Sequence, residues 1–111
     1  MAAIANLTID QGATFTSDVT VKDANAQPFD LTGYTAQAKM AKGFASTRTR
    51  TTITTTLPSN PATGTVTLSL TSAQTAALDA ERYVYDLEIT KGSEVTRVIE
   101  GLITVRHQVT T

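Results

Sequence analysis

Residues 82–90 read Arg-Tyr-Val-Tyr-Asp-Leu-Glu-Ile-Thr, and this stretch decides the fold class. Apolar side chains recur at every second position, which is the period of an extended strand with one buried face. The inward set is Tyr83, Tyr85, Leu87 and Ile89, and the outward set is Arg82, Asp86, Glu88 and Thr90, with Val84 as an apolar exception. We therefore predict a half-buried β-strand over residues 82–90.

The same alternation recurs along the chain, in which 23 of the 111 residues are threonine. Threonine is β-branched, favours the pleated backbone and places a hydroxyl on the solvated face of a strand. Further strands are predicted over residues 6–10, 13–22, 34–40, 51–57, 66–70 and 95–106, with 51–57 as an edge strand. Turn residues separate these segments, as in an all-β sandwich or barrel.

Two connections between the predicted strands are specific. Thr71 and Gln74 have the spacing of a capping box, which predicts a helix of about two turns over residues 71–79, crossing from one sheet to the other. Gly92 and Ser93 lie at the centre of a predicted hairpin with a loop of about four residues, which would pair residues 82–90 with 95–106 in antiparallel fashion.

Tyr83 suggests a particular kind of sandwich. Asp79 lies four residues before Tyr83, and the inward Tyr85 follows two residues after it. Immunoglobulin-like sandwiches carry a tyrosine corner at the start of strand F, two residues before a conserved inward position. Alternatively, the two tyrosines are ordinary core aromatics. The prediction for residues 1–111 is a single all-β domain: an immunoglobulin-like antiparallel β-sandwich of about seven strands, with one short helix between strands E and F.

Composition excludes several classes of function. A net charge of −1 lacks the basic excess of a nucleic-acid-binding protein. Without cysteine, the chain has no thiolate nucleophile, disulfide or Cys-ligated metal. No apolar run approaches the roughly 20 residues of a membrane-spanning helix. We expect no nucleic acid, membrane or cofactor among its partners.

Enzyme chemistry is not expected either. His107 is the single histidine, and the sequence offers it no recognisable nucleophile and orienting carboxylate. Asp86 and Glu88 share one strand face about 7 Å apart by strand geometry, as a glycosidase pair would, but such carboxylates usually form a solvated face. We predict that the chain is not an enzyme.

Two features suggest an interaction surface. Residues 31–78 carry only positive charges, Lys39, Lys42, Arg48 and Arg50, and these flank Phe44. This basic hairpin either contacts an acidic neighbouring subunit or is a solvated edge protected against mispairing.

The second feature lies in residues 95–106. Val98 and Leu102 stand at even-numbered positions, whereas Val95, Ile99, Ile103 and Val105 stand at odd-numbered ones. Because side chains alternate between the two faces of a strand, apolar side chains would lie on both faces. Either a subunit covers the second face, or Gly101 marks a β-bulge that changes the parity.

The order of several motifs resembles a known family. They are Asp-Leu-Thr-Gly-Tyr at 30–34, Thr-Gly-Thr-Val-Thr-Leu-Ser-Leu at 63–70, Arg-Tyr-Val-Tyr-Asp-Leu-Glu-Ile at 82–89 and Glu-Gly-Leu-Ile-Thr-Val at 100–105. Together they resemble the small immunoglobulin-like domain of tailed-bacteriophage structural proteins, such as the N-terminal domain of the phage baseplate upper protein.

The resemblance implies a non-catalytic structural component of a tailed-phage virion, in the capsid decoration, the neck, or the tail and baseplate. Its partners would be other virion structural proteins, it would be oligomeric in the particle, and it would be assembled in the host cytoplasm. One alternative is a stand-alone carbohydrate-binding or adhesin module, for which Phe44 is the candidate exposed aromatic. Another is a small hydrolase that uses Asp86 and Glu88.

Overall fold

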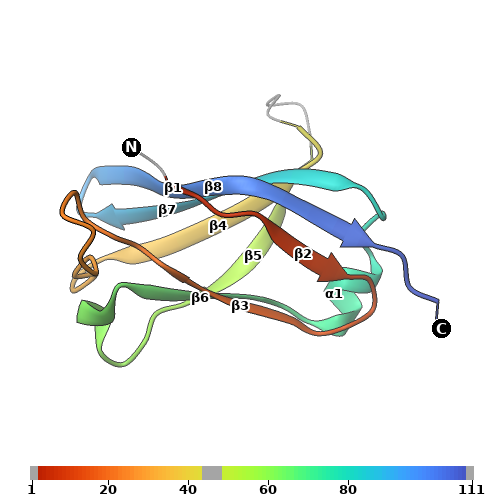
Figure 1. Ribbon diagram of the computed structural model, residues 1–111, viewed down its shortest axis with the longest axis horizontal. Helices are drawn as coiled ribbons and strands as arrows, with labels where there is room; N and C mark the ends of the chain where they lie inside the picture. Colours follow the sequence, from red (N-terminus) through yellow and green to blue (C-terminus); the bar gives the residue numbers. More distant parts are fainter. Residues whose placement is uncertain (1–2, 44–48, 110–111) are drawn as a thin grey trace.

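The computed structural model describes residues 3–43 and 49–109 as two β-sheets packed face to face (Figure 1). The strands are β1 (Ala3–Ile4), β2 (Leu7–Asp10), β3 (Phe15–Thr20), β4 (Thr35–Ala41), β5 (Thr51–Thr56), β6 (Thr65–Leu70), β7 (Arg82–Lys91) and β8 (Glu94–Arg106). A 3₁₀ turn, η1 (Pro61–Thr63), precedes β6, and a short helix, α1 (Ser72–Ala76), connects β6 to β7.

The strand order is that of an immunoglobulin-like sandwich. The neighbours in the first sheet are β8, β7 and β4, which correspond to strands G, F and C. In the second sheet, β3 and β6 pair as strands B and E. The predicted fold and the helix between strands E and F are confirmed. The first strand departs from a purely antiparallel arrangement, because β1 and β2 both pair with β8 in parallel.

Strand β5 connects the two sheets, because each half of it pairs with a different partner. Its first half pairs with β4, with Ile53 opposite Ala38, and its second half pairs with β6. Where β5 separates from β4, the Thr55 hydroxyl donates to the Ala36 carbonyl at 3.0 Å and replaces a ladder bond. The strand that was predicted as an edge strand therefore forms the edge of the first sheet with its first half and the edge of the second sheet with its second half.

The core contains nearly every residue that the alternation placed inside. At alternating apolar positions of the predicted strands 13–22, 34–40, 66–70 and 82–90, the buried residues are Phe15, Val19, Met40, Leu68, Leu70, Tyr83, Tyr85, Leu87 and Ile89. Tyr34 is only half-buried: its ring packs edge-on against Phe29 with centroids 5.5 Å apart, and the Lys91 ammonium lies 5.3 Å from its centroid. Period two was therefore sufficient to find the inward faces of β3, β4, β6 and β7.

The β7–β8 hairpin differs from the prediction in its loop and in its bulge. Lys91 pairs with Glu94, so the loop has two residues instead of four, and Gly92 has φ 62°, as the first position of a type II′ turn requires. The register shifts opposite Leu87 and Glu88, which makes Val98 the extra residue. The bulge therefore lies at Val98 and not at Gly101.

Gly101 has a different role, because the N-terminal segment crosses directly over it. A Cβ on Gly101 would lie 2.2 Å from the Ala5 carbonyl oxygen. That oxygen accepts a 2.6 Å hydrogen bond from the buried Tyr85 hydroxyl, and the Ala5 N–H donates to the Glu100 carbonyl at 3.0 Å. The absent side chain lets the first strand pack against the sheet.

Helix α1 is shorter than predicted, but it begins where the sequence indicated. Thr71 and Gln74 form both hydrogen bonds of the capping box. The fully buried Thr75 hydroxyl donates to the Ala13 carbonyl at 2.8 Å and accepts from the Gly12 N–H at 3.0 Å. Thr75 thus joins the helix to the turn between β2 and β3, which lies far away in the sequence.

We expect Thr75→Val to lower the free energy of unfolding by about 1–3 kcal/mol, because the isosteric side chain leaves the Gly12 N–H and the Ala13 carbonyl without their partner. Urea denaturation measures this change. The control is Thr52→Val at an exposed position of β5, for which we expect a change within about 0.5 kcal/mol. Equal effects of the two substitutions would contradict the role assigned to Thr75.

Candidate interaction surface

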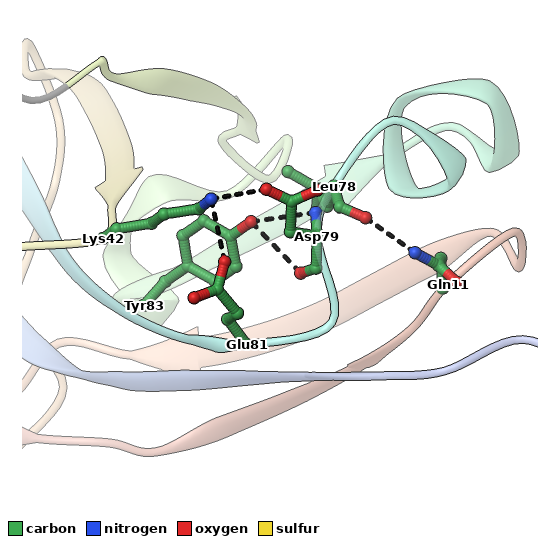
Figure 2. Close-up of polar contacts among 6 residues, drawn as sticks. All are labelled: Gln11, Lys42, Leu78, Asp79, Glu81 and Tyr83. Atoms are coloured by element: carbon green, nitrogen blue, oxygen red, sulfur yellow. Dashed lines mark hydrogen bonds and ion pairs between the residues drawn. The ribbon is translucent and has the colours of Figure 1, made fainter.

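Tyr83 forms the predicted tyrosine corner at the end of α1. The Asp79 N–H donates to the Tyr83 hydroxyl oxygen at 3.0 Å, and that hydroxyl donates to the Asp79 carbonyl at 3.1 Å (Figure 2). Tyr83 is 5% exposed. Its hydroxyl is therefore bonded to backbone four residues upstream, and the alternative of an ordinary core aromatic is excluded.

Lys42, one of the four predicted contact cations, is neutralised within the domain. Its ammonium pairs with the Asp79 carboxylate and, at 2.8 Å, with the Glu81 carboxylate, directly over the tyrosine corner (Figure 2). The hydrogen bonds to Asp79 and Glu81 raise the pKa of Lys42 above its ordinary value. Carboxylates of the β6–β7 connection thus compensate the charge of Lys42, so it is a weaker candidate for contact with an acidic partner than the sequence suggested.

The remaining members of the basic hairpin are placed differently. Lys39 is exposed on the outward face of β4. One Arg50 guanidinium nitrogen donates to the Gly43 carbonyl at 3.2 Å. Phe44 and Arg48 lie outside the described residues.

Val98 and Leu102 do not share an outer face. Val98, at the bulge, packs against the hydrophobic core as a half-buried residue, whereas Leu102 is 37% exposed on the opposite face. The bulge also explains why Val95, four residues before the buried Ile99, is 56% exposed. The expectation that Val98 and Leu102 share an outer face is therefore wrong for Val98, and of the two residues only Leu102 lies on that face.

Leu102 belongs to an ordered array on the outer face of β4, β7 and β8. The cross-strand registers place side chains in three rows, each running across the three strands: Ala41, Val84 and Leu102; Lys39, Asp86 and Glu100; and Gln37, Glu88 and Arg97. We call this array the outer-face surface. Its first row is apolar and the other two are polar or charged.

The apolar row is exposed toward one end. Ala41 is 3% exposed, Val84 is half-buried, and Leu102 presents its side chain to solvent. The Leu102 N–H donates to the Asn6 side-chain oxygen at 3.0 Å, which holds the N-terminal segment beside this row. The exposed apolar surface of this row therefore comes from Val84 and Leu102.

The charged rows are linked by Arg97. Its guanidinium pairs with the Asp86 carboxylate at 3.3 Å and with the Glu100 carboxylate at 3.7 Å. All three side chains are between 35% and 51% exposed, so the pairs contribute little to stability. A shallow hollow of about 290 Å³ lies over these rows, lined in part by Lys39, Arg50, Val84, Asp86 and Arg97. Asp86 and Glu88, considered above as a carboxylate pair, are members of this array.

Comparisons with known proteins concern the fold alone. No protein-family model matches the chain, and no curated protein matches it. Among solved structures, InlP of Listeria monocytogenes is similar over 95% of this chain at 15% identity with a TM-score of 0.49, and this chain spans 28% of that one. The BTLA ectodomain is similar over 94% of this chain and 90% of its own at 13% identity, with a TM-score of 0.44.

Residues 3–43 and 49–109 were also searched for metal-binding side chains and for membrane-spanning helices. No group of three or more His, Asp or Glu side chains in these ranges could hold a metal ion. Within the same ranges, no helix has the length and hydrophobicity to cross a membrane.

The contacts of Ala5, Asn6 and Tyr85 were not foreseen from the sequence. The Tyr85 hydroxyl bonds to a carbonyl 80 residues away, and Asn6 bonds to an amide 96 residues away. No short sequence pattern predicts either contact. The one hint is Gly101, whose missing side chain lets the N-terminal segment pass close to β8. Burial raises the pKa of Tyr85 to about 12.

We expect the free energy of unfolding to fall as pH rises from about 10 to about 12. Unfolded Tyr85 loses its proton near pH 10 while the folded form keeps it, so unfolding releases a proton within this window. The stabilisation is fully present below about pH 10, and its loss is at most about 1.4 kcal/mol per pH unit. Denaturation at several alkaline pH values measures the slope, which should be shallower in Tyr85→Phe. Identical slopes would contradict this assignment.

Proposed function

We propose that this domain is a non-catalytic structural component of a tailed-phage virion, which contacts other virion proteins through the outer-face surface. The observation that carries the contact is the in-register apolar row of Ala41, Val84 and Leu102 beside two charged rows. The sequence motifs that resemble phage immunoglobulin-like domains support the virion assignment. The proposed location is the assembled particle, formed in the host cytoplasm.

The two parts of the surface have different roles in this proposal. Burial of Val84 and Leu102 by a neighbouring subunit supplies the desolvated centre that protein interfaces use for affinity. Lys39, Asp86 and Arg97 surround that centre with both signs of charge, which orients the partner and excludes wrong registers. A rigid three-strand platform loses little conformational entropy on docking.

The test is incorporation of a Leu102→Glu variant into particles, measured by quantitative mass spectrometry against the major capsid protein. We expect incorporation to fall about tenfold or more, because a charge then replaces the exposed end of the apolar row. The isolated domain should remain folded, since the position is solvent-exposed. The control is Thr56→Glu, exposed on β5 outside this surface. Normal incorporation of the Leu102 variant would contradict the proposed contact.

A further inference from the structure

A second surface, independent of the outer face, lies along β3. Among the described strands, β3 pairs only with β6, and β2 pairs only with β8 in the other sheet. Both strands run along the same side of the sandwich (Figure 1). That side of the domain therefore presents an unpaired strand edge.

The backbone of β3 is oriented for further pairing. Just beyond the strand, the Val21 N–H donates to the Gly64 carbonyl at 2.8 Å, and the Val21 carbonyl accepts from the Phe29 N–H at 2.9 Å. Both polar groups of Val21 thus point into the domain. Because these directions alternate along an extended chain, the backbone groups of Asp18, Thr20 and Lys22 point toward the open side.

The open side also exposes apolar surface. A groove of about 430 Å³ separates β3 from the β1–β2 segment, and its lining includes Ile4, Leu7 and Val98 together with the buried Val19 and Val21. Ile4 is 75% exposed there. An unpaired edge beside an apolar groove is a site for pairing with another strand.

We propose that a second copy of this chain occupies this edge, with the two β3 strands antiparallel about a two-fold axis at Thr20. Asp18 then lies opposite Lys22 of the second copy, and Lys22 opposite its Asp18. Both residues are exposed, and no ion-pair partner of Lys22 is present among the described residues. On the inner face, Val19 lies opposite Val21 of the second copy, and both side chains are already buried in their own domain. The exposed charges are therefore self-complementary, as a two-fold interface requires.

Two neighbouring registers are less favourable. A two-fold axis at Asp18 would place the two Asp18 carboxylates opposite each other, which is destabilising. A slip of one residue would place inward side chains of one β3 strand, such as Val19, on the same face of the paired strands as outward side chains of the other, such as Asp18. In the Thr20-centred register, the pairs Asp18–Lys22, Thr20–Thr20 and Lys22–Asp18 each have outward backbone groups, so each exchanges N–H···O=C hydrogen bonds.

The first test is a charge exchange measured by sedimentation velocity over micromolar to millimolar concentrations. We expect the unchanged chain to dimerise and Asp18→Lys to weaken dimerisation about tenfold, since it places lysine opposite lysine. Lys22→Asp should weaken it similarly, and the double variant Asp18→Lys/Lys22→Asp should restore the original affinity. A chain that stays monomeric throughout, or a double variant weaker than either single one, would overturn the proposal.

The second test uses the absence of cysteine from the chain. Directly opposed, hydrogen-bonded residues in an antiparallel pair have Cα atoms about 5.5 Å apart, within the range that a disulfide spans. Thr20→Cys should therefore form a covalent dimer under mild oxidation. Thr16→Cys, exposed on the same strand, should not, because it lies away from its own counterpart. Equal cross-linking of the two variants, or none at Thr20, would overturn this register.

Discussion

Leu87→Ala is expected to lower the free energy of unfolding by about 2–5 kcal/mol. Leu87 is fully buried at the centre of β7, between Ala38 on β4 and Ile99 on β8 in the cross-strand register. Removal of its side chain loses apolar burial and leaves a cavity that three hydrogen-bonded strands cannot easily close. A loss of this size is a large part of the stability of a domain of this length.

Guanidinium or urea denaturation at equilibrium provides this measurement. The neighbouring Glu88→Ala serves as control, since Glu88 lies on the outer face in the same strand. We expect it to change the free energy by about 0.5 kcal/mol or less. A cost below about 1 kcal/mol for Leu87→Ala would show that the inward register of β7 is wrong.

Gly101→Ala is expected to destabilise the domain by about 3 kcal/mol. The new Cβ would lie 2.2 Å from the Ala5 carbonyl oxygen, a backbone atom that can move only if the N-terminal segment leaves the sheet. Overpacking of this kind costs about 1–3 kcal/mol. Displacement of Ala5 would also remove the hydrogen-bond partner of the buried Tyr85 hydroxyl, at about 1–3 kcal/mol.

Gly92→Ala separates this clash from the ordinary cost of replacing glycine. Gly92 has a positive φ, but a Cβ added there would meet no atom within 4 Å, so only backbone strain of about 1 kcal/mol applies. Hydrogen exchange at residues 3–6 should increase in Gly101→Ala and not in Gly92→Ala. Equal stabilities of the two variants would contradict the close crossing at Gly101.

Local periodicity was enough to predict most of the fold. Alternation in residues 82–90 gave the inward face of β7, and the Thr71–Gln74 spacing gave the start of α1. Tyr83 was predictable for a similar reason, because the tyrosine corner joins residues only four positions apart. Each of these signals lies within one short stretch of sequence.

The features that were missed depend on contacts between distant residues. The bulge at Val98 is set by pairing with β7, and period-two counting inside one strand could not locate it. Lys42 looked like a free cation because its partners Asp79 and Glu81 lie far along the chain. The outer-face surface likewise depends on the register between three strands. The sequence therefore indicated Leu102 and Lys39 as contact residues, but it could not show that Val84 lies beside Leu102 on the neighbouring strand.

The outer-face surface and the β3 edge lie on different sheets and can act together. The outer face belongs to β4, β7 and β8, whereas the self-pairing edge belongs to β3. A domain that pairs with its own copy through one sheet and docks on a different subunit through the other is suited to a repeating assembly. Asp18→Lys and Leu102→Glu should therefore have separable effects, the first on dimerisation in solution and the second on incorporation.

The most direct test of the proposal that this chain is a virion component is quantitative mass spectrometry of phage particles purified from a lysate that contains the chain. We predict that the chain is present at a fixed copy number relative to the major capsid protein and stays with the particles through density-gradient purification. Hundreds of copies would indicate capsid decoration, and a small multiple of three, five, six or twelve would indicate the neck or the tail. Absence from purified particles, while the chain is abundant in the infected-cell lysate, would contradict its assignment as a virion structural component.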